Sequence, residues 1–245
     1  MEVYVLGSAA GIPTRNRHCT SIAIASNELL WLMDCGEPVS GQLVRAGLSP
    51  LQVDMIFISH FHTDHVSGLP LLIQVCQLRR RRRPLTIYAP DNPEERIWTI
   101  LKSLHLEPEK LPFKINIVEV PSDKPSMILE SSRLKVGSIP TVHPPVPSVA
   151  YSLYAEGKKV FFSGDLKISD SLVEFAYGSD LLILEAAHNP LDDIGRFVDM
   201  ANPKILLINH IHPKLDEAEA EINYAIQKYY NGRILIARDL MRITL

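Results

Sequence analysis

The sequence predicts an α/β protein built from mixed β-sheets with helices on their outer faces. Three observations lead to this fold class. Short apolar segments typical of strands alternate with amphipathic segments typical of helices. Some strands are near-continuous apolar runs, which indicates that both of their faces are covered. Others come in pairs separated by a tight turn, so antiparallel hairpins must lie beside parallel crossovers.

The predicted strands follow one another along the whole chain. Two hairpins are expected, one turning at Ser26-Asn27 and the other at Gly157-Lys158. In chain order, the segments predicted as strands are Val3–Gly7, Ser21–Ala25, Leu29–Met33, Met55–Ile58, Leu85–Tyr88, Ile115–Val120, Arg133–Val136, Ala150–Ala155, Val160–Phe162, Leu181–Leu184, Ile205–Ile208 and Ile234–Ala237.

The helical segments lie between the strands. The clearest is the last one, because apolar residues recur along it at steps of three and four and Gly232 follows as a stop signal. The predicted helices are Glu37–Ala46, Val66–Leu78, Pro93–Leu104, Asp170–Tyr177, Asp192–Met200 and Leu215–Tyr229.

Size and composition predict one large domain spanning residues 1–245. The chain has 245 residues, 46% of them hydrophobic, and no Gly/Ser-rich linker or internal repeat divides it. The segment Pro140–Pro147 is interpreted as a rigid loop, because strands resume directly after it. No apolar run approaches the roughly 20 residues that cross a bilayer, so no membrane partner is expected.

Three widely spaced cysteines, Cys19, Cys35 and Cys76, form no Cys-x-x-Cys pair. They predict reduced, buried thiols in a cytoplasmic protein rather than a disulfide framework. The segment Met1–Gly7 alternates like a strand and does not have the pattern of a signal peptide.

The formal net charge of −3 argues against a general attraction to nucleic acid. The run Arg79–Arg83 leaves a local exception open. Because it follows an apolar helix, it is either a solvated helix end, a contact for a phosphate backbone or a contact for another anionic partner.

One hexapeptide, His60-Phe61-His62-Thr63-Asp64-His65, concentrates four strong metal ligands. It follows an apolar strand and precedes an apolar helix, so it is predicted to be a loop where α/β sheets bind their ligands. Alternation along the loop lets His60 and His62 converge on one ion, while Asp64 and His65 turn to another. This ligand set suits zinc, manganese or iron, and pairs of such ions serve in metal-assisted hydrolysis.

Two ions need further ligands, and three candidates follow later strands. His143 lies in the proline-rich loop, Asp165 in the turn after Val160–Phe162, and His210 at the end of Ile205–Ile208. Each alone also fits an ordinary role, as a loop histidine, a helix N-cap or a solvated histidine. Their shared position at strand ends makes them joint candidates for metal ligands, with Asp165 able to bridge both ions.

Glu185 and His188 form a second candidate pair. Glu185 ends the strand Leu181–Leu184, and His188 follows three residues later. They are interpreted as a carboxylate–imidazole pair that donates a proton to a leaving group. The alternative is a helix-capping turn with an exposed histidine.

These motifs resemble those of the metallo-β-lactamase superfamily, whose hallmark is His-x-His-x-Asp-His, and within it those of ribonuclease Z, the tRNA 3′-processing endonuclease. The segments that carry the resemblance are Leu6-Gly7-Ser8, Gly11-Ile12-Pro13-Thr14-Arg15-Asn16-Arg17, Asp34-Cys35-Gly36-Glu37, Gly68-Leu69-Pro70, Ser163-Gly164-Asp165 and Glu185-Ala186.

The resemblance implies a four-layer α/β/β/α sandwich with the metals at one edge of the two sheets. It implies that one metal is bound by His60, His62 and His143, that the other is bound by Asp64, His65 and His210, and that Asp165 bridges them. It also implies a homodimer.

The chain departs from the ribonuclease Z pattern in three places. A tight turn, Glu156-Gly157-Lys158-Lys159, stands where the family carries a long tRNA-gripping arm. The family's closing His-x-Ser-x-Arg-Tyr reads His210-Ile211-His212-Pro213-Lys214-Leu215, and the segment after the glutamate reads Ala187-His188-Asn189. The tRNA substrate therefore does not follow from the resemblance, although RNA stays among the candidate partners.

Taken together, these features predict a dinuclear metal-dependent hydrolase, first of all a phosphodiesterase related to ribonuclease Z. Zinc is expected before manganese or iron. A metal-bridging water would attack, Asp64 would bind metal and handle the proton of the water, and His188 with Glu185 would protonate the departing oxygen. Two alternatives stay open, a lactonase or other ester hydrolase on the same fold and a non-catalytic nucleic-acid-binding protein.

Overall fold

The computed structural model describes residues 1–245 and contains two seven-stranded β-sheets. The first sheet has the order β14-β1-β2-β3-β4-β5-β6, with β1 (Glu2–Gly7), β2 (Ser21–Ser26), β3 (Leu29–Met33), β4 (Val53–Phe57), β5 (Leu85–Ala89), β6 (Ile115–Glu119) and β14 (Arg242–Thr244). The second has the order β13-β12-β11-β10-β9-β8-β7, with β7 (Ser126–Glu130), β8 (Lys135–Thr141), β9 (Ser148–Ala155), β10 (Lys158–Phe162), β11 (Leu181–Glu185), β12 (Ile205–Asn209) and β13 (Arg233–Ile236).

Both sheets are mixed, as the sequence predicts. In the first, β1, β2 and β3 pair antiparallel, with a long loop between β1 and β2 and a tight turn between β2 and β3, whereas β3 to β6 run parallel. In the second, β7 to β10 pair antiparallel and β10 to β13 run parallel. The last strand, β14, returns to the first sheet beside β1, so the end of the chain links the two halves.

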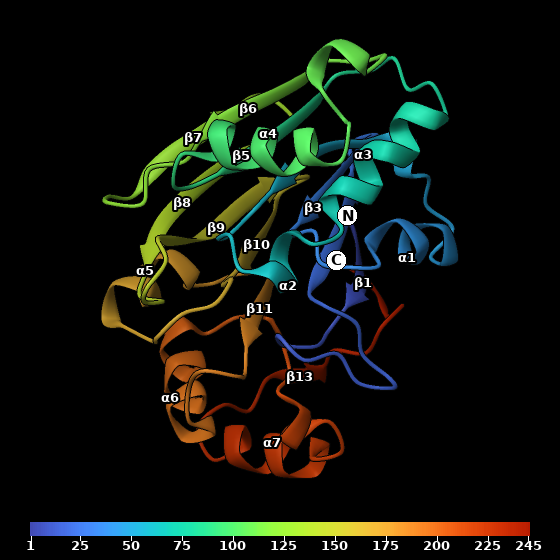
Figure 1. Ribbon diagram of the computed structural model, residues 1–245. Coiled ribbons are helices and arrows are strands. Elements are labelled where there is room, and N and C mark those ends of the chain that lie inside the picture. The colour runs from blue at the N-terminus through green and yellow to red at the C-terminus, as the bar shows by residue number, and fades with distance from the viewer.

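Helices cover the outer face of each sheet, as Figure 1 shows. The first sheet carries α1 (Val39–Arg45), α3 (Leu69–Leu78) and α4 (Pro93–Ser103), whose apolar faces pack on it in one core cluster. The second carries α5 (Asp170–Ala176), α6 (Leu191–Ala201) and α7 (Glu219–Gln227) in another. The short α2 (Thr63–Val66) follows β4, and three 3₁₀ turns complete the helices, η1 (Pro50–Gln52), η2 (Pro108–Lys110) and η3 (Pro213–Leu215).

A third core fills the space between the two sheets. It combines large side chains from the inner faces of both, including Trp31 and Phe57 from the first half and Tyr151 and Leu153 from the second, all fully buried. Three apolar cores therefore separate four layers, and the expected α/β/β/α sandwich is confirmed.

The two sheets are tied together where β4 ends. The hydroxyl of Tyr151 on β9 donates to the carbonyl of Ile58 over 2.7 Å, and the amide of Val149 donates to the carbonyl of Ser59 over 3.0 Å. The chain leaving β4 therefore runs directly alongside the second sheet. This junction brings the segment after Ser59 close to the strand ends of the other half.

The predicted helix Val66–Leu78 is in fact two helices. Helix α2 begins earlier, at Thr63, and the chain breaks before α3 at Gly68. A Cβ at Gly68 would lie 2.7 Å from Cγ1 of Val39 and 2.8 Å from the carbonyl oxygen of Gly36, so only glycine allows this close approach. The expected helix Leu215–Tyr229 is also shorter, because η3 and a turn precede α7.

Strands β7 and β14 are not among the predicted strands. The predicted strand Arg133–Val136 overlaps only the first two residues of β8, which begins at Lys135 and continues to Thr141. No helix is both long and apolar enough to span a bilayer. The three cysteines are free and buried, as expected.

Candidate metal centre

The predicted ligands converge at the edge where the two sheets meet. The His60–His65 segment follows β4, and His143 follows β8. Asp165 comes shortly after β10, and His210 directly after β12. Since parallel strands end at the same edge of a sheet, residues distant in sequence gather at one rim.

The turn that carries Asp165 depends on a glycine. Gly164 has a φ of +54°, and a Cβ there would lie 2.5 Å from the Cβ of Ser59. A larger residue would be strained in backbone conformation and would collide with the segment that leads into the metal-ligand motif. Gly164 therefore lets the two sheets approach closely at this edge.

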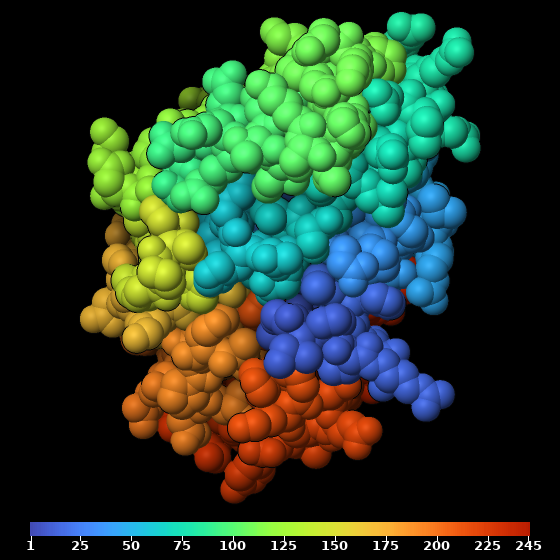
Figure 2. Space-filling model, viewed as in Figure 1, coloured from blue at the N-terminus to red at the C-terminus, as the bar shows by residue number.

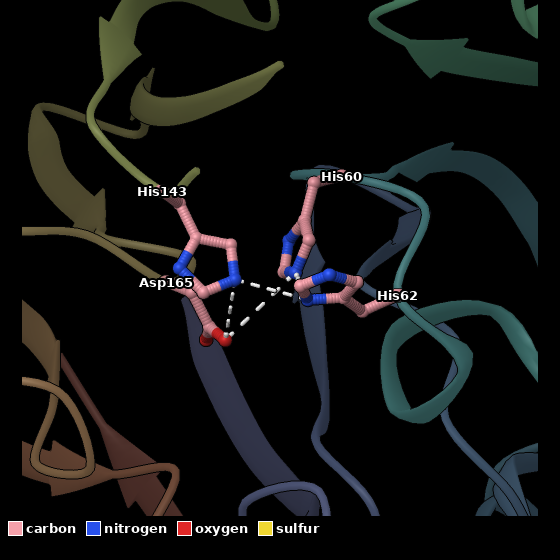
Figure 3. A group of neighbouring side chains, drawn as sticks. All are labelled: His60, His62, His143 and Asp165. Carbon is pink, nitrogen blue, oxygen red and sulfur yellow. Dashed lines mark hydrogen bonds and ion pairs between the residues drawn. The ribbon is translucent and has the colours of Figure 1, made fainter. Parts of the chain in front are cut away.

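Four of these side chains form a first group of candidate metal ligands, called the first ligand group and shown in Figure 3. His60 Nε2 lies 3.0 Å from His62 Nδ1, which in turn lies 2.9 Å from His143 Nε2. Oδ2 of Asp165 lies 3.8 Å from His60 Nε2 and 3.7 Å from His143 Nε2. Two histidines approach from the first half of the chain, and a histidine and a carboxylate approach from the second.

A second group of candidate ligands, called the second ligand group, lies on the other side of Asp165. Asp64 Oδ2 is 3.2 Å from His210 Nε2 and 3.4 Å from His65 Nε2. Oδ1 of Asp165 is 3.3 Å from His65 Nε2 and 3.2 Å from His210 Nε2. The two oxygens of one carboxylate thus face two different sets of nitrogen donors.

The residues present fit divalent metal ions. His65 Nε2 and Asp165 Oδ1 are buried and make no hydrogen bond, although buried polar atoms normally have a partner. In the first group, His62 Nδ1 lies within 3.0 Å of both His60 Nε2 and His143 Nε2, and a cation between these nitrogens would stabilise such close packing. Donor atoms this close together, all nitrogen or carboxylate oxygen, match zinc, manganese or iron.

The electrostatics of the first group favour the forms that bind metal. Burial lowers the pKa of His60 and that of His143, so both rings stay neutral with a free lone pair. Burial would raise the pKa of Asp165, but the imidazoles of His65 and His210 outweigh it and lower that pKa. Neutral imidazoles around an ionised carboxylate are the ligand state that a divalent cation requires.

Asp64 follows the same pattern in the second group. Burial alone would raise its pKa, but hydrogen bonds with His210 and His65 lower it. His65 behaves oppositely: burial would lower its pKa, yet the carboxylates of Asp165 and Asp34 raise it. This side of the site therefore favours positive charge, which either a proton or a metal ion can supply.

Asp34 was not among the predicted site residues. It follows β3 with a φ of +57°, and its Oδ2 lies 2.6 Å from His65 Nδ1. The amide of Ser59 donates to its Oδ1 over 2.7 Å, and the hydroxyl of Ser59 donates to its Oδ2 over 2.9 Å. Its position in the Asp34-Cys35-Gly36-Glu37 segment was the one sequence signal for a role.

Glu185 and His188 lie together beside the ligands. Oε2 of Glu185 accepts hydrogen bonds from the amides of Ala187 and His188 over 2.6 and 3.0 Å, and it lies 3.2 Å from His188 Nδ1. This hydrogen bond raises the pKa of His188, against the opposing effect of burial. His188 Nδ1 is also 3.8 Å from Asp165 Oδ2, so the imidazole borders the first group.

The arginine run is not a uniform basic patch. Arg81 is buried, and its guanidinium donates to the carbonyls of Leu51, Arg83 and Pro84 over 2.7, 2.7 and 2.6 Å. It therefore closes the end of α3 against β5, whereas its neighbours in the run are exposed. Of the three interpretations of this run, a helix end, a phosphate-backbone contact or a contact for another anionic partner, the contacts of Arg81 support the helix end.

Two mixed sheets between helix layers, with a histidine and aspartate centre at their shared edge, define a protein of the metallo-β-lactamase fold. The solved structures agree. The short form of human tRNase Z (ELAC1) superimposes with a TM-score of 0.81 at 24% identity, covering 100% of this chain and 99% of that one. The metallo-β-lactamase fold protein YhfI from Bacillus subtilis gives 0.83 at 22% identity, covering 99% of both.

Within this class the chain is ribonuclease Z-like. Ribonuclease Z of Methanothermobacter thermautotrophicus is 27% identical over 303 aligned positions, covering 99% of this chain and 96% of that enzyme. Ribonuclease Z of Methanococcus maripaludis strain C6 is 36% identical over 151 residues, which are 62% of this chain. That match spans only 48%, about half, of the relative's own length.

A family model described as "Anti-Pycsar protein Apyc1" matches residues 1–221. The chain belongs to this family.

Proposed function

We propose that this protein is a dinuclear metal-dependent hydrolase that cleaves phosphodiesters, and that residues 1–245 act as one hydrolase domain. The observation that supports two ions is the position of Asp165. Its Oδ2 faces the first ligand group, and its Oδ1 faces His65 and His210 over 3.3 and 3.2 Å. A carboxylate that faces two donor sets with separate oxygens is suited to bridging paired ions.

In this proposal His60, His62 and His143 would hold one ion, Asp64, His65 and His210 would hold the other, and Asp165 would serve as a ligand shared by the two. Zinc suits the all-nitrogen-and-oxygen ligand set best, and manganese or iron would also be accepted. When bound, such ions would supply a water of lowered pKa and positive charge for the oxygens of the substrate.

The remaining steps belong to side chains of the chain itself. Asp64 would orient the attacking water and accept its proton, since its carboxylate is ionised and belongs to the second group. His188 would donate a proton to the departing oxygen. Glu185 would hold His188 in its charged form through the 3.2 Å contact between Oε2 and Nδ1.

Phosphodiesters are preferred as substrates because the curated relatives named above are ribonucleases. RNA is one candidate substrate, but the aligned ribonuclease Z spans 303 positions against 245 residues here, so it carries segments that this chain lacks. The turn between β9 and β10 is only Glu156-Gly157. A smaller phosphodiester therefore fits this chain better than a substrate that needs a gripping arm.

A lactonase or other ester hydrolase is the second candidate. It is favoured by the sequence after His210, where no serine or arginine is available for a phosphate. His212 does not replace them through its Nδ1, because that atom accepts the amide of Lys214 over 3.2 Å. The non-catalytic nucleic-acid reading is weaker, since Arg81 is used inside the fold.

One substrate panel tests these candidates. It contains a 3′-extended tRNA precursor, bis(p-nitrophenyl) phosphate, cyclic nucleotides and a homoserine lactone, each assayed with wild type and with His65→Ala. Metal analysis of protein purified without added metal accompanies it. We expect two ions per chain, turnover of at least one phosphodiester, and its loss in His65→Ala and after chelation. Turnover of the lactone alone would replace the phosphodiesterase proposal with the ester hydrolase.

The proposal extends to the state of the protein in the cell. Three buried, free cysteines support a reducing, cytoplasmic location. The ribonuclease Z-like character supports a homodimer, which light scattering of the purified, metal-loaded protein would test.

A further inference from the structure

A short loop, Gly11–Asn16, borders the second ligand group. A Cβ at Gly11 would lie only 3.7 Å from Asp64 Oδ2, so the loop backbone passes directly beside that ligand. The rest of the loop projects into solvent, and the side chain of Ile12 is 62% exposed. Figure 2 shows this blue N-terminal segment on the same face as the teal, yellow and orange segments that meet near the centre.

The loop is held by hydrogen bonds at its two ends, residues 8–10 and 17–18, which are called its roots below. At the first root, the amide of Ala10 donates to the carbonyl of Ile211 over 3.1 Å. At the second, the carbonyl of His18 accepts the amide of Ala9 over 2.8 Å. Whatever fixes residues 8–10 and 17–18 therefore fixes how the loop lies against Asp64.

A single carboxylate contacts both roots. Asp239 lies in the turn between β13 and β14, where the chain crosses from the second sheet to the first. Its Oδ1 accepts the amide and the hydroxyl of Ser8 over 3.0 and 2.7 Å. Its Oδ2 accepts the amide of His18 over 2.9 Å and lies 2.7 Å from His18 Nδ1. Gln42 Nε2 donates to the same oxygen over 3.3 Å.

A buried arginine completes the network. Arg17 donates to Ser8 Oγ over 3.0 Å, to the carbonyl of Ala237, and to Asp216 Oδ1 over 2.5 Å. Its side chain is 4% exposed and that of Asp239 is 10% exposed. Charge-assisted hydrogen bonds in such surroundings are stronger than neutral ones. None of these groups is a ligand or a proton donor in the proposed mechanism, so the network needs another explanation.

We propose that Asp239 is a positioning residue that fixes the loop Gly11–Asn16 beside Asp64 and thereby shapes the wall against which substrate binds. The role in substrate binding rests on the proposed hydrolase function. The role in holding the loop does not. Because the hydrogen-bond partners of Asp239 are Ser8, His18 and Gln42, none of them a proposed metal ligand, its loss should weaken substrate binding while leaving the chemical step intact.

Asp239→Asn in the full-length, metal-loaded protein tests this. The matched control is Asp180→Asn, which removes another buried, hydrogen-bonded carboxylate at the opposite end of β11 from Glu185. We expect amide hydrogen exchange of residues 8–18 to accelerate about tenfold or more in Asp239→Asn alone, as the loss of charged hydrogen bonds implies. KM for the phosphodiester turned over best should rise about tenfold with kcat within about threefold, and metal content should not change.

Ser8→Ala is a milder second variant, should Asp239→Asn fail to fold. It removes one hydrogen bond to Asp239 and one from Arg17, and it should shift both measurements in the same direction by less. The proposal is overturned if exchange of residues 8–18 and KM stay at wild-type values. It is also overturned if kcat and metal content fall together, or if Asp180→Asn raises KM equally. Should wild type turn over no substrate, the proposed function fails, while the exchange measurement still decides whether Asp239 holds the loop.

Discussion

Asp34 Oδ2 lies 2.6 Å from His65 Nδ1, and both side chains are fully buried although 31 positions separate them in the chain. The contact assigns the Nδ1 proton of His65 to the hydrogen bond and leaves its Nε2 facing Asp165 and Asp64. Ser59 donates twice to the same carboxylate, so the orienting group is itself held in place. Asp34 thus aligns His65, a candidate ligand of the second group, without being a candidate ligand itself.

Asp34→Ala should therefore weaken metal binding without removing a ligand. Loss of an orienting carboxylate of this kind typically lowers metal affinity about 10–100-fold. The measurement is competition for zinc with a chromophoric chelator, with ion release followed at fixed pH. Asp54→Ala is the control, because Asp54 accepts the amide of Leu30 but has no contact with the ligands. Equal affinities of Asp34→Ala and wild type would show that packing alone orients His65.

The difference between His60 and Asp34 shows what the sequence can reveal of this site. The ligand motif is local, so six consecutive residues sufficed to predict it, and His143, Asp165 and His210 could be added because each follows a strand. Asp34 also follows a strand, β3. It was not predicted, because its partner His65 lies in α2, which follows β4, and the parallel pairing of β3 with β4 that brings the two together is encoded by no local pattern.

The same limit applies to the fold. The central strand β11 was predicted because all of its residues are buried and Leu181–Leu184 form an unbroken apolar run. Only the part of β4 from Met55 onward was predicted, since Asp54 interrupts its apolar run. The edge strands β7 and β14 were not, since β7 is half exposed and β14 has three residues. The break at Gly68 depends on contact with Val39 and Gly36, which only the folded chain brings together.

His188→Gln should slow the reaction without lowering the amount of metal that the protein binds. A positioned proton donor contributes about 10²–10⁴-fold, so kcat should fall in that range for a substrate with an alkoxide leaving group. The loss should be much smaller for bis(p-nitrophenyl) phosphate, because p-nitrophenolate leaves without needing a proton. Steady-state kinetics with both substrates, together with metal analysis, would measure this contrast.

His105→Gln is the matched control for that substitution, because the side chain of His105 is 87% exposed and remote from the ligands. A fall in metal content in His188→Gln would contradict the proton-donor role. It would instead make His188 a ligand, which geometry allows because His188, Asp165 and His210 offer donor atoms within 4.8 Å of one another.

Arg81→Ala should destabilise the protein rather than abolish binding to RNA. The substitution leaves the carbonyls of Leu51, Arg83 and Pro84 without their donor and removes a cation–π contact with Phe113. A buried group left unpaired costs about 1–3 kcal/mol, whereas water can replace the lost donor at the exposed Arg83 and Pro84. A loss of about 2–4 kcal/mol in the free energy of unfolding is therefore expected. Urea denaturation would measure it.

Arg82→Ala provides the comparison, since Arg82 is exposed and should change stability by less than about 0.5 kcal/mol. If any arginine of the run binds a polyanion, the exposed ones do so. A gel-shift assay would compare RNA binding by Arg82→Ala and Arg81→Ala. The assignment would be contradicted if only Arg81→Ala lost RNA binding while its stability was unchanged.

The contribution of Asp180 to the stability of the fold depends on pH. Burial would raise the pKa of its carboxyl, but bonds from the ammonium of Lys204 and the amide of Lys159, at 2.9 and 2.8 Å, lower it. A carboxyl with a lower pKa in the folded chain stabilises the fold above its unfolded pKa of about 3.9, and this contribution is lost as pH falls through the folded value.

Asp180→Asn should therefore be less stable than wild type by about 1–2 kcal/mol at pH 7. Urea denaturation at a series of pH values should show this difference shrinking below about pH 4. The exposed Asp123→Asn should show no such trend. If the stability difference between wild type and Asp180→Asn stayed constant down to about pH 3, the charge of the Asp180 carboxylate would contribute nothing to stability.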